Sequence, residues 1–143
     1  MKYVLLVSHG QFAPGFHDTL KMFTGGDRED ILHVNLENGM GADEYAENVK
    51  KVIAHITAED EIIVLADIVG GSPLTNAANV IAEAGLLANT TIIGGMNLPL
   101  AISVVMEKDD EDTKDMVEEW LEVSKEALKP FEVVVEEDDD EDL

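Results

Sequence analysis

Four short apolar runs, separated by stretches with helical periodicity, constrain the fold of this chain more than any other feature. They occupy residues 3–8, 31–36, 61–66 and 90–94, each bounded by turn residues or charges. Strands that are apolar on both sides belong to parallel sheets covered by helices on both faces. The alternation therefore predicts a single-domain, doubly wound α/β fold, with a mostly parallel four-stranded sheet and right-handed crossovers.

The intervening stretches predict three helices, and two more follow the fourth run. We expect them at residues 14–23, 42–56, 73–84, 98–107 and 113–129. In the second, Tyr45, Val49, Ile53 and Ile56 recur at spacings of three and four, as on a buried helix face. The fifth is predicted to bury Met116, Val117, Trp120, Leu121 and Val123.

A valine-rich segment, residues 131–135, predicts a late strand at the edge of the sheet. An exposed strand of this kind invites pairing with another chain, although the charged residues after it favour a blunted, unpaired edge. Residues 136–143 are almost purely acidic and are expected to be disordered. We therefore predict one domain, residues 1–135, and an acidic tail, residues 136–143.

The charge of the chain limits its partners. The sequence holds 31 acidic and 9 basic residues, a formal net charge of −22. Such a field repels phosphate backbones and anionic lipid, which argues against nucleic acid and direct membrane contact. It favours a basic protein partner, while solubility alone is the alternative reason for the acidity.

The N-terminus and the rest of the chain predict a cytoplasmic protein. The first apolar run has a single lysine and is too short for a signal peptide. No segment approaches the roughly 18 apolar residues of a membrane span. The absence of cysteine excludes a thiolate metal site and a cysteine nucleophile.

His9 is the first candidate for chemistry. Reactive groups in open α/β sheets gather after the carboxyl ends of the strands, near a topological switch point. His9 follows the first strand, and Gly10 lets the backbone turn away. A neutral imidazole is a good nucleophile near pH 7, and one nitrogen can react while a hydrogen bond holds the other. A histidine that merely ends a strand is the alternative.

Asp67 strengthens the assignment of His9. It follows the third strand, and if the first and third strands are neighbours it lies beside His9. A carboxylate on one imidazole nitrogen selects the tautomer and orients the ring. A turn-forming aspartate before glycines is the alternative.

Gly70, Gly71, Ser72 and Pro73 open the third helix, with Ser72 predicted as its N-cap and Pro73 as its first residue. Free amides and the helix dipole make such a terminus attractive to anions. Beside His9 and Asp67 it predicts donors for the oxygens of a transferred phosphoryl group. A capped helix with nothing bound is the alternative.

Other sites are not indicated by the sequence. His17, His33 and His55 lie within predicted helices and strands, and we assign them no role. No metal-ligand spacing, nucleotide phosphate loop, dinucleotide fingerprint or nucleophile elbow occurs, so we predict no metal and no cofactor.

At these residues the chain resembles the IIA components of the mannose-family sugar phosphotransferase system (PTS). The resemblance extends from the first strand to the helix of Trp120. Its sharpest elements are Ser8-His9-Gly10, the block from Asp67 to Ala78, and residues 94–99. Three such elements in the same order are fairly specific.

The resemblance implies a phosphotransferase with a phosphohistidine intermediate. His9 would take a phosphoryl group from the phosphocarrier HPr and pass it to a IIB component, which serves the sugar-importing IIC and IID membrane subunits. Asp67 would orient the His9 ring, and Gly70, Gly71 and Ser72 would hold the phosphoryl group. The resemblance further implies a homodimer that exchanges the C-terminal strand, here residues 131–135. It leaves the transported sugar open.

Three alternatives remain at this point. A receiver domain would be phosphorylated on Asp67, although such domains carry an acidic pair where this chain has Ser8-His9. A IIA-like phosphotransfer subunit of dihydroxyacetone kinase would carry similar residues. A non-catalytic acidic binding module would not be phosphorylated at all.

Overall fold

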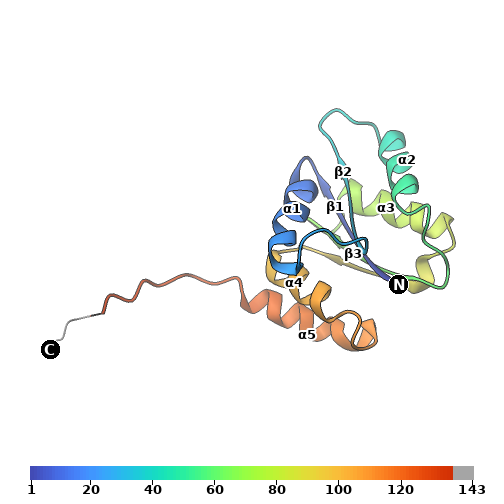
Figure 1. The fold of residues 1–143 in the computed structure, drawn as a ribbon. Helices are drawn as coiled ribbons and strands as arrows, with labels where there is room; N and C mark the ends of the chain where they lie inside the picture. Colours follow the sequence, from blue (N-terminus) through green and yellow to red (C-terminus); the bar gives the residue numbers. More distant parts are fainter. Residues whose placement is uncertain (137–143) are drawn as a thin grey trace.

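The computed structural model describes residues 1–136 and shows the predicted α/β architecture (Figure 1). Its elements alternate until the fourth strand and then continue as two helices. In order they are β1 (Lys2–His9), α1 (Phe12–Thr24), β2 (Ile31–Leu36), α2 (Ala42–Val52), β3 (Glu61–Ala66), α3 (Ser72–Glu83), the 3-10 turn η1 (Leu87–Asn89), β4 (Thr90–Gly94), α4 (Leu98–Glu107) and α5 (Thr113–Glu126).

The four strands of the described region form one parallel sheet in the order β2-β1-β3-β4. β1 pairs with β2 on one side and with β3 on the other, so the topological switch point lies between β1 and β3. Val7 of β1 stands opposite Val34 and Ala66, which aligns the carboxyl ends of the three strands. This register delivers the segments after β1 and β3 to the same edge.

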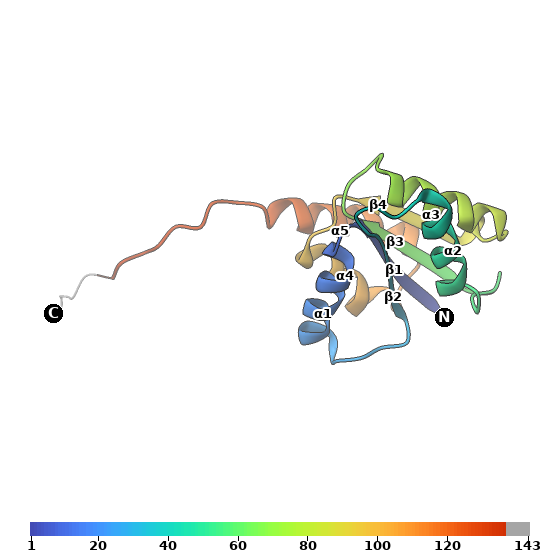
Figure 2. The same cartoon turned by 90° about the horizontal axis from the view of Figure 1, so that it is seen from above.

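Helices cover both faces of the sheet, as Figure 2 shows from above. One core contains Val4, Leu6 and Ile63 with buried residues of α1, α4 and α5, including the fully buried Trp120. The other contains Leu5, Val7 and Val64 with α2 and α3. Successive residues of β1 therefore enter opposite cores, which explains why this strand is apolar throughout.

Several details differ from the sequence prediction: α1 begins at Phe12 rather than at residue 14, and α5 ends at Glu126 rather than at residue 129. α2 ends at Val52 rather than at residue 56, although Ile53 and Ile56 remain buried in the turn that follows. Val123 is exposed, and Ser124 takes the inward position on α5. The N-cap of α3 is Gly71, and Ser72 is already helical. The extended backbone of Gly71 starts the helix one residue earlier than Ser72 would have.

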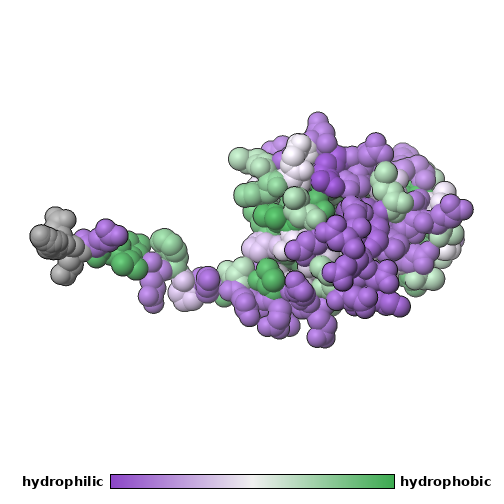
Figure 3. Space-filling model, turned by 60° about the horizontal axis from the view of Figure 1, so that its bottom comes forward, coloured by the Kyte–Doolittle hydropathy of each residue, from purple (hydrophilic) through white to green (hydrophobic). Residues whose placement is uncertain are grey.

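The predicted strand at residues 131–135 is not formed in the single chain. Residues 129–136 run outward from α5, as Figure 1 shows, and Phe131, Val133, Val134 and Val135 are 76–89% exposed. An extended segment without a neighbouring strand has no partners for its backbone hydrogen bonds, which explains the missing strand. Figure 3 shows these apolar side chains standing apart from the folded body. Most of the predicted acidic tail, residues 137–143, lies outside the described residues.

Among residues 1–136, no helix combines the length and the apolar character that crossing a bilayer requires.

Candidate phosphoryl-transfer site

His9 is the last residue of β1, and the chain around it is held from two sides. The buried Ser8 hydroxyl accepts the Ala13 N–H at 2.7 Å, and thereby caps the start of α1. The Gly10 N–H donates to the Leu36 carbonyl at 2.8 Å, and the Asn35 side chain donates to the Gly10 carbonyl at 2.7 Å. The residues on both sides of His9 are therefore fixed by α1 and by the end of β2.

Asp67 lies directly after β3 and accepts three N–H groups. Its Oδ2 receives the backbone N–H of His9 at 3.0 Å and lies 2.8 Å from His9 Nδ1, while Oδ1 receives the Ile68 N–H at 2.9 Å. Burial acts to raise the pKa of Asp67, but the His9 and Ile68 donors outweigh it, and the pKa is lowered. Asp67 is therefore a carboxylate at neutral pH.

The Asp67 carboxylate selects the tautomer of His9. An ionised carboxylate only accepts hydrogen bonds, so Nδ1 carries the proton and Nε2 keeps its lone pair. The His9 side chain is 46% exposed and that of Asp67 only 16%. The ring is therefore partly open to solvent, while its Nδ1 is held by a largely buried carboxylate.

The start of α3 lies close to the His9 ring. A Cβ added to Gly71 would come 2.8 Å from His9 Cε1, the carbon between Nδ1 and Nε2. Only glycine at this position lets the ring approach the helix terminus so closely. The Thr75 N–H closes the first turn on the Gly71 carbonyl at 3.0 Å, and the Ser72 hydroxyl accepts the Asn76 side chain at 2.8 Å.

The end of β4 supports the loop between Asp67 and Gly71. A Cβ on Gly94 would come 2.4 Å from Val69 Cγ2 and 3.0 Å from the Val69 backbone nitrogen. The absence of a side chain at Gly94 therefore lets this loop pack directly against the end of β4. After it, the Asn97 side chain caps α4 by accepting the Leu100 N–H at 2.9 Å.

The structure thus brings the predicted residues His9, Asp67, Gly71 and Ser72 to one edge of the sheet. At this edge the imidazole of His9 lies beside a carboxylate that can stabilise positive charge on the ring. The positive end of the α3 helix dipole lies next to the same ring. This combination suits transfer of an anionic group to and from nitrogen.

Sequence reasoning overlooked several supporting residues. Asn35 is the penultimate residue of β2, so its position at the carboxyl end of a strand next to β1 was a usable signal. Tyr45 was assigned only to a buried helix face, and nothing in the sequence indicated the bond that its hydroxyl makes to α3.

The remaining histidines lie away from this edge. The rings of His17 and His33 meet with Nδ1 atoms 2.7 Å apart, linking α1 to β2. His55 packs edge-on against Tyr3. Within residues 1–136 no group of three or more His, Asp or Glu side chains is arranged to hold a metal ion.

Comparisons with known proteins agree with the geometry. A model of the EIIA-man family, described as "PTS system fructose IIA component", matches residues 3–121. The fructose-specific EIIA component of Bacillus subtilis is 25% identical over 126 residues, 88% of this chain and 84% of that protein. The mannose-specific EIIAB component of Escherichia coli is 24% identical over 127 residues, and the match covers only 38% of that longer protein.

Solved structures show the same fold. The IIA protein associated with the fucose utilization operon of Streptococcus pneumoniae has a TM-score of 0.76 and 27% identity, over 90% of this chain and 92% of that one. The mannose/sorbose-specific IIA subunit of Enterococcus faecalis has a TM-score of 0.78 and 20% identity, over 96% of this chain and 100% of that one. With nearly the whole folded region matched by the family, this chain belongs to the EIIA-man family of IIA components of the sugar phosphotransferase system.

Proposed function

We propose that this chain carries a phosphoryl group on Nε2 of His9, taking it from HPr and delivering it to a IIB component. Membership of the IIA family supports the general function, a phosphoryl carrier in sugar transport by a phosphotransferase system. The assignment to Nε2 of His9 is supported by the contact of 2.8 Å between Asp67 Oδ2 and His9 Nδ1, because it leaves Nε2 as the nitrogen that can react.

The transfer step follows from this geometry. The Nε2 lone pair attacks phosphorus, the bond from phosphorus to the donor's imidazole nitrogen breaks, and its electron pair stays on the donor. The His9 ring becomes positively charged with its proton still on Nδ1, and the Asp67 carboxylate stabilises that charge. Delivery to IIB is the same displacement on phosphorus with His9 as the leaving group.

Gly70, Gly71 and Ser72 are the groups that we propose for the phosphoryl oxygens. Gly71 at the start of α3 lies close to Cε1 of the ring, so the free amides of this first turn are the nearby donors proposed for a group on Nε2. The Ser72 hydroxyl accepts from Asn76, so its own proton is available to a phosphoryl oxygen. These donors would act on the charge of the transferred group as it moves.

Side chains around His9 fit docking of a protein donor. Phe12, Ile68 and Val69 are exposed apolar residues from the segments that flank His9 and Asp67. Exposed apolar groups around a reactive residue favour contact with another protein surface. Together with the net charge of −22, they fit a cytoplasmic exchange with basic protein partners rather than with a small substrate.

We further propose that the chain acts as a homodimer through residues 131–135. β4 is an edge strand of the described sheet, and the exposed valines of this segment would pair with β4 of a second copy. A groove of about 190 Å³ beside β4, lined by Ile93, Gly95, Leu121 and Leu128, lies where such a strand would enter. Light scattering of the full chain and of a variant ending at Lys129 tests this, with a dimer and a monomer as the expected results.

Intact-mass measurement after mixing with HPr, enzyme I and phosphoenolpyruvate tests the carrier function. We expect one added phosphoryl group on the wild type, lost on return to acid, and none on His9→Ala. Labelling that survives in His9→Ala would contradict the assignment, and labelling that disappears only in Asp67→Asn would favour a receiver domain. His55→Ala is the matched control and should be labelled like the wild type.

A further inference from the structure

Tyr45 of α2 makes a buried polar contact that the packing of this helix does not require. Its side chain is fully buried in the core between the sheet and the α2–α3 layer. Its hydroxyl donates to the Pro73 carbonyl at 2.8 Å. A buried hydroxyl without a partner is costly, so this bond restricts where the first turn of α3 can lie relative to α2.

Besides the packing of Pro73 and Leu74, the first turn of α3 has few other hydrogen-bond restraints. Gly71 offers no side-chain cap, and the ring of Pro73 removes one backbone N–H from the turn. The Ser72 hydroxyl is engaged with Asn76 rather than with the terminus. The bond from the Thr75 N–H to the Gly71 carbonyl closes the turn within the chain. Tyr45 adds a link from a neighbouring helix.

Tyr45 also lies close enough to Asp67 to sense its charge. Burial raises the pKa of the Tyr45 hydroxyl, and the Asp67 carboxylate raises it further. The hydroxyl therefore stays protonated at any working pH and remains a donor.

We propose that Tyr45 is a positioning residue for phosphoryl transfer, since its hydroxyl holds the first turn of α3 at the distance from His9 at which the turn's amides receive the phosphoryl oxygens. The inference rests on the proposed function of His9. Tyr45 touches neither His9 nor the phosphoryl group, and acts through the Pro73 carbonyl.

Tyr45→Phe tests the inference, because it removes one oxygen and keeps the buried ring. Tyr3→Phe is the matched control: Tyr3 lies in the same core, but at the amino end of β1. With phospho-HPr as donor, we expect Tyr45→Phe to lower the maximal transfer rate about five- to tenfold and to leave the half-saturating HPr concentration unchanged. Tyr3→Phe should remain within about twofold of the wild type.

A purely structural role predicts another pattern. Tyr45→Phe would then lose thermal stability through the missing bond to Pro73 but transfer phosphoryl groups as fast as Tyr3→Phe, and that result would overturn the inference. A slower rate caused by a raised half-saturating HPr concentration would also overturn it, because it would place Tyr45 in docking rather than in positioning.

Amide hydrogen exchange separates the inference from the carrier function. If the wild type accepts no phosphoryl group from HPr, the proposed function fails, but the link from Tyr45 to α3 can still be measured. Faster exchange of the Thr75 amide in Tyr45→Phe, and not in Tyr3→Phe, would support the link. Equal exchange in both variants would refute it.

Discussion

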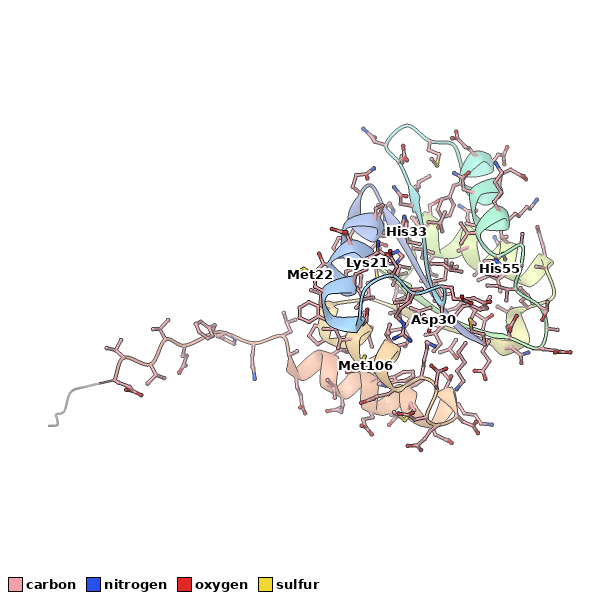
Figure 4. All side chains as sticks on the ribbon, viewed as in Figure 1. Lys21, Met22, Asp30, His33, His55 and Met106 are labelled. Carbon is pink, nitrogen blue, oxygen red and sulfur yellow. The ribbon has the colours of Figure 1, made fainter. Side chains whose placement is uncertain are left out.

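Two largely buried carboxylates, Asp67 and Asp30, lie at opposite ends of the sheet and have different kinds of partner. Asp67 follows β3 at the carboxyl edge and accepts N–H groups from His9 and Ile68. Asp30 precedes β2 at the other edge and binds two cations, Arg28 at 2.9 Å and Lys108 at 2.8 Å. Figure 4 labels Asp30 among the side chains at that end of the sheet.

The difference separates the proposed reactive site from a structural cluster. The charge of Asp30 is neutralised within the protein by Arg28 and by Lys108. The Lys108 side chain is only 1% exposed, so it is not available to an external partner. The charge of Asp67 is met by hydrogen bonds from the backbone and ring of His9 and from the Ile68 N–H, and the His9 side chain is 46% exposed. A carboxylate with a shifted pKa indicates a reactive site when its partner remains accessible, and a stabilising contact when its partner is buried.

Removing Lys108 should produce the largest loss of stability. Lys108→Ala leaves Asp30 without one of its two cations in a buried setting, so we expect the free energy of unfolding to fall by about 3 kcal/mol. Phosphoryl transfer by the protein that remains folded should be unchanged. Lys50→Ala removes an exposed pair with Glu47 and should cost less than about 0.5 kcal/mol. Urea unfolding measures both, and equal losses would show that the Asp30 cluster is not structural.

Asp67→Asn should reverse this pattern. The amide can no longer stabilise positive charge on His9 and can favour the wrong tautomer, so we expect transfer to slow by about 100-fold or more. Stability should change far less than in Lys108→Ala. Asp60→Asn, which alters a carboxylate bound to the N-terminus, is the control and should transfer normally. A variant at Asp67 with full transfer activity would remove the contrast between the two carboxylates.

Gly71→Ala tests the close approach of the ring to α3. The added Cβ would come 2.8 Å from His9 Cε1, so the ring must move, and we expect transfer to slow by about tenfold. Gly41→Ala is closely matched, because Gly41 is the N-cap of α2, has nearly the same backbone angles and has open space around its Cα. Rate measurements on both variants decide the matter, since equal slowing would assign the effect to capping alone.

The smallest predicted effect concerns pH. Burial lowers the pKa of His17, and the nearby His33 and Lys21 lower it further, while Asp27 and Asp18 raise it by less. Burial and Lys21 also lower the pKa of His33. Figure 4 shows Lys21 and His33 close together in this view. Because the folded state binds these protons less readily than the unfolded state, stability is present above a pH of about 6.5 and declines as the pH falls below it.

His33→Gln should flatten this decline. Urea midpoints at several pH values between about 7.5 and 5.5 measure it, with His55→Gln as the control. An unchanged pH dependence in His33→Gln would show that the contact between His17 and His33 does not contribute.

Local patterns predicted the strands and the contact between His9 and Asp67 well. The strands β2, β3 and β4 begin and end at the predicted residues, because buried parallel strands are marked by uninterrupted apolar runs. The meeting of His9 and Asp67 was predictable because it depends only on the pairing of β1 with β3.

Contacts between distant side chains were not predictable. The bond from Tyr45 to Pro73 and the contact of His17 with His33 depend on how helices dock, which periodicity does not encode. Residues 131–135 were predicted as a strand from β-propensity, but a strand also needs a neighbour, and the single chain supplies none.

Identification of the phosphorylated atom tests the central claim most directly. Nitrogen-15 and phosphorus-31 NMR of the chain, labelled by phospho-HPr, distinguishes the two ring nitrogens of His9 from each other and from an aspartyl phosphate. The account predicts phosphorus on Nε2 of His9 with the proton retained on Nδ1. Phosphorus on Nδ1, or on Asp67, would contradict it.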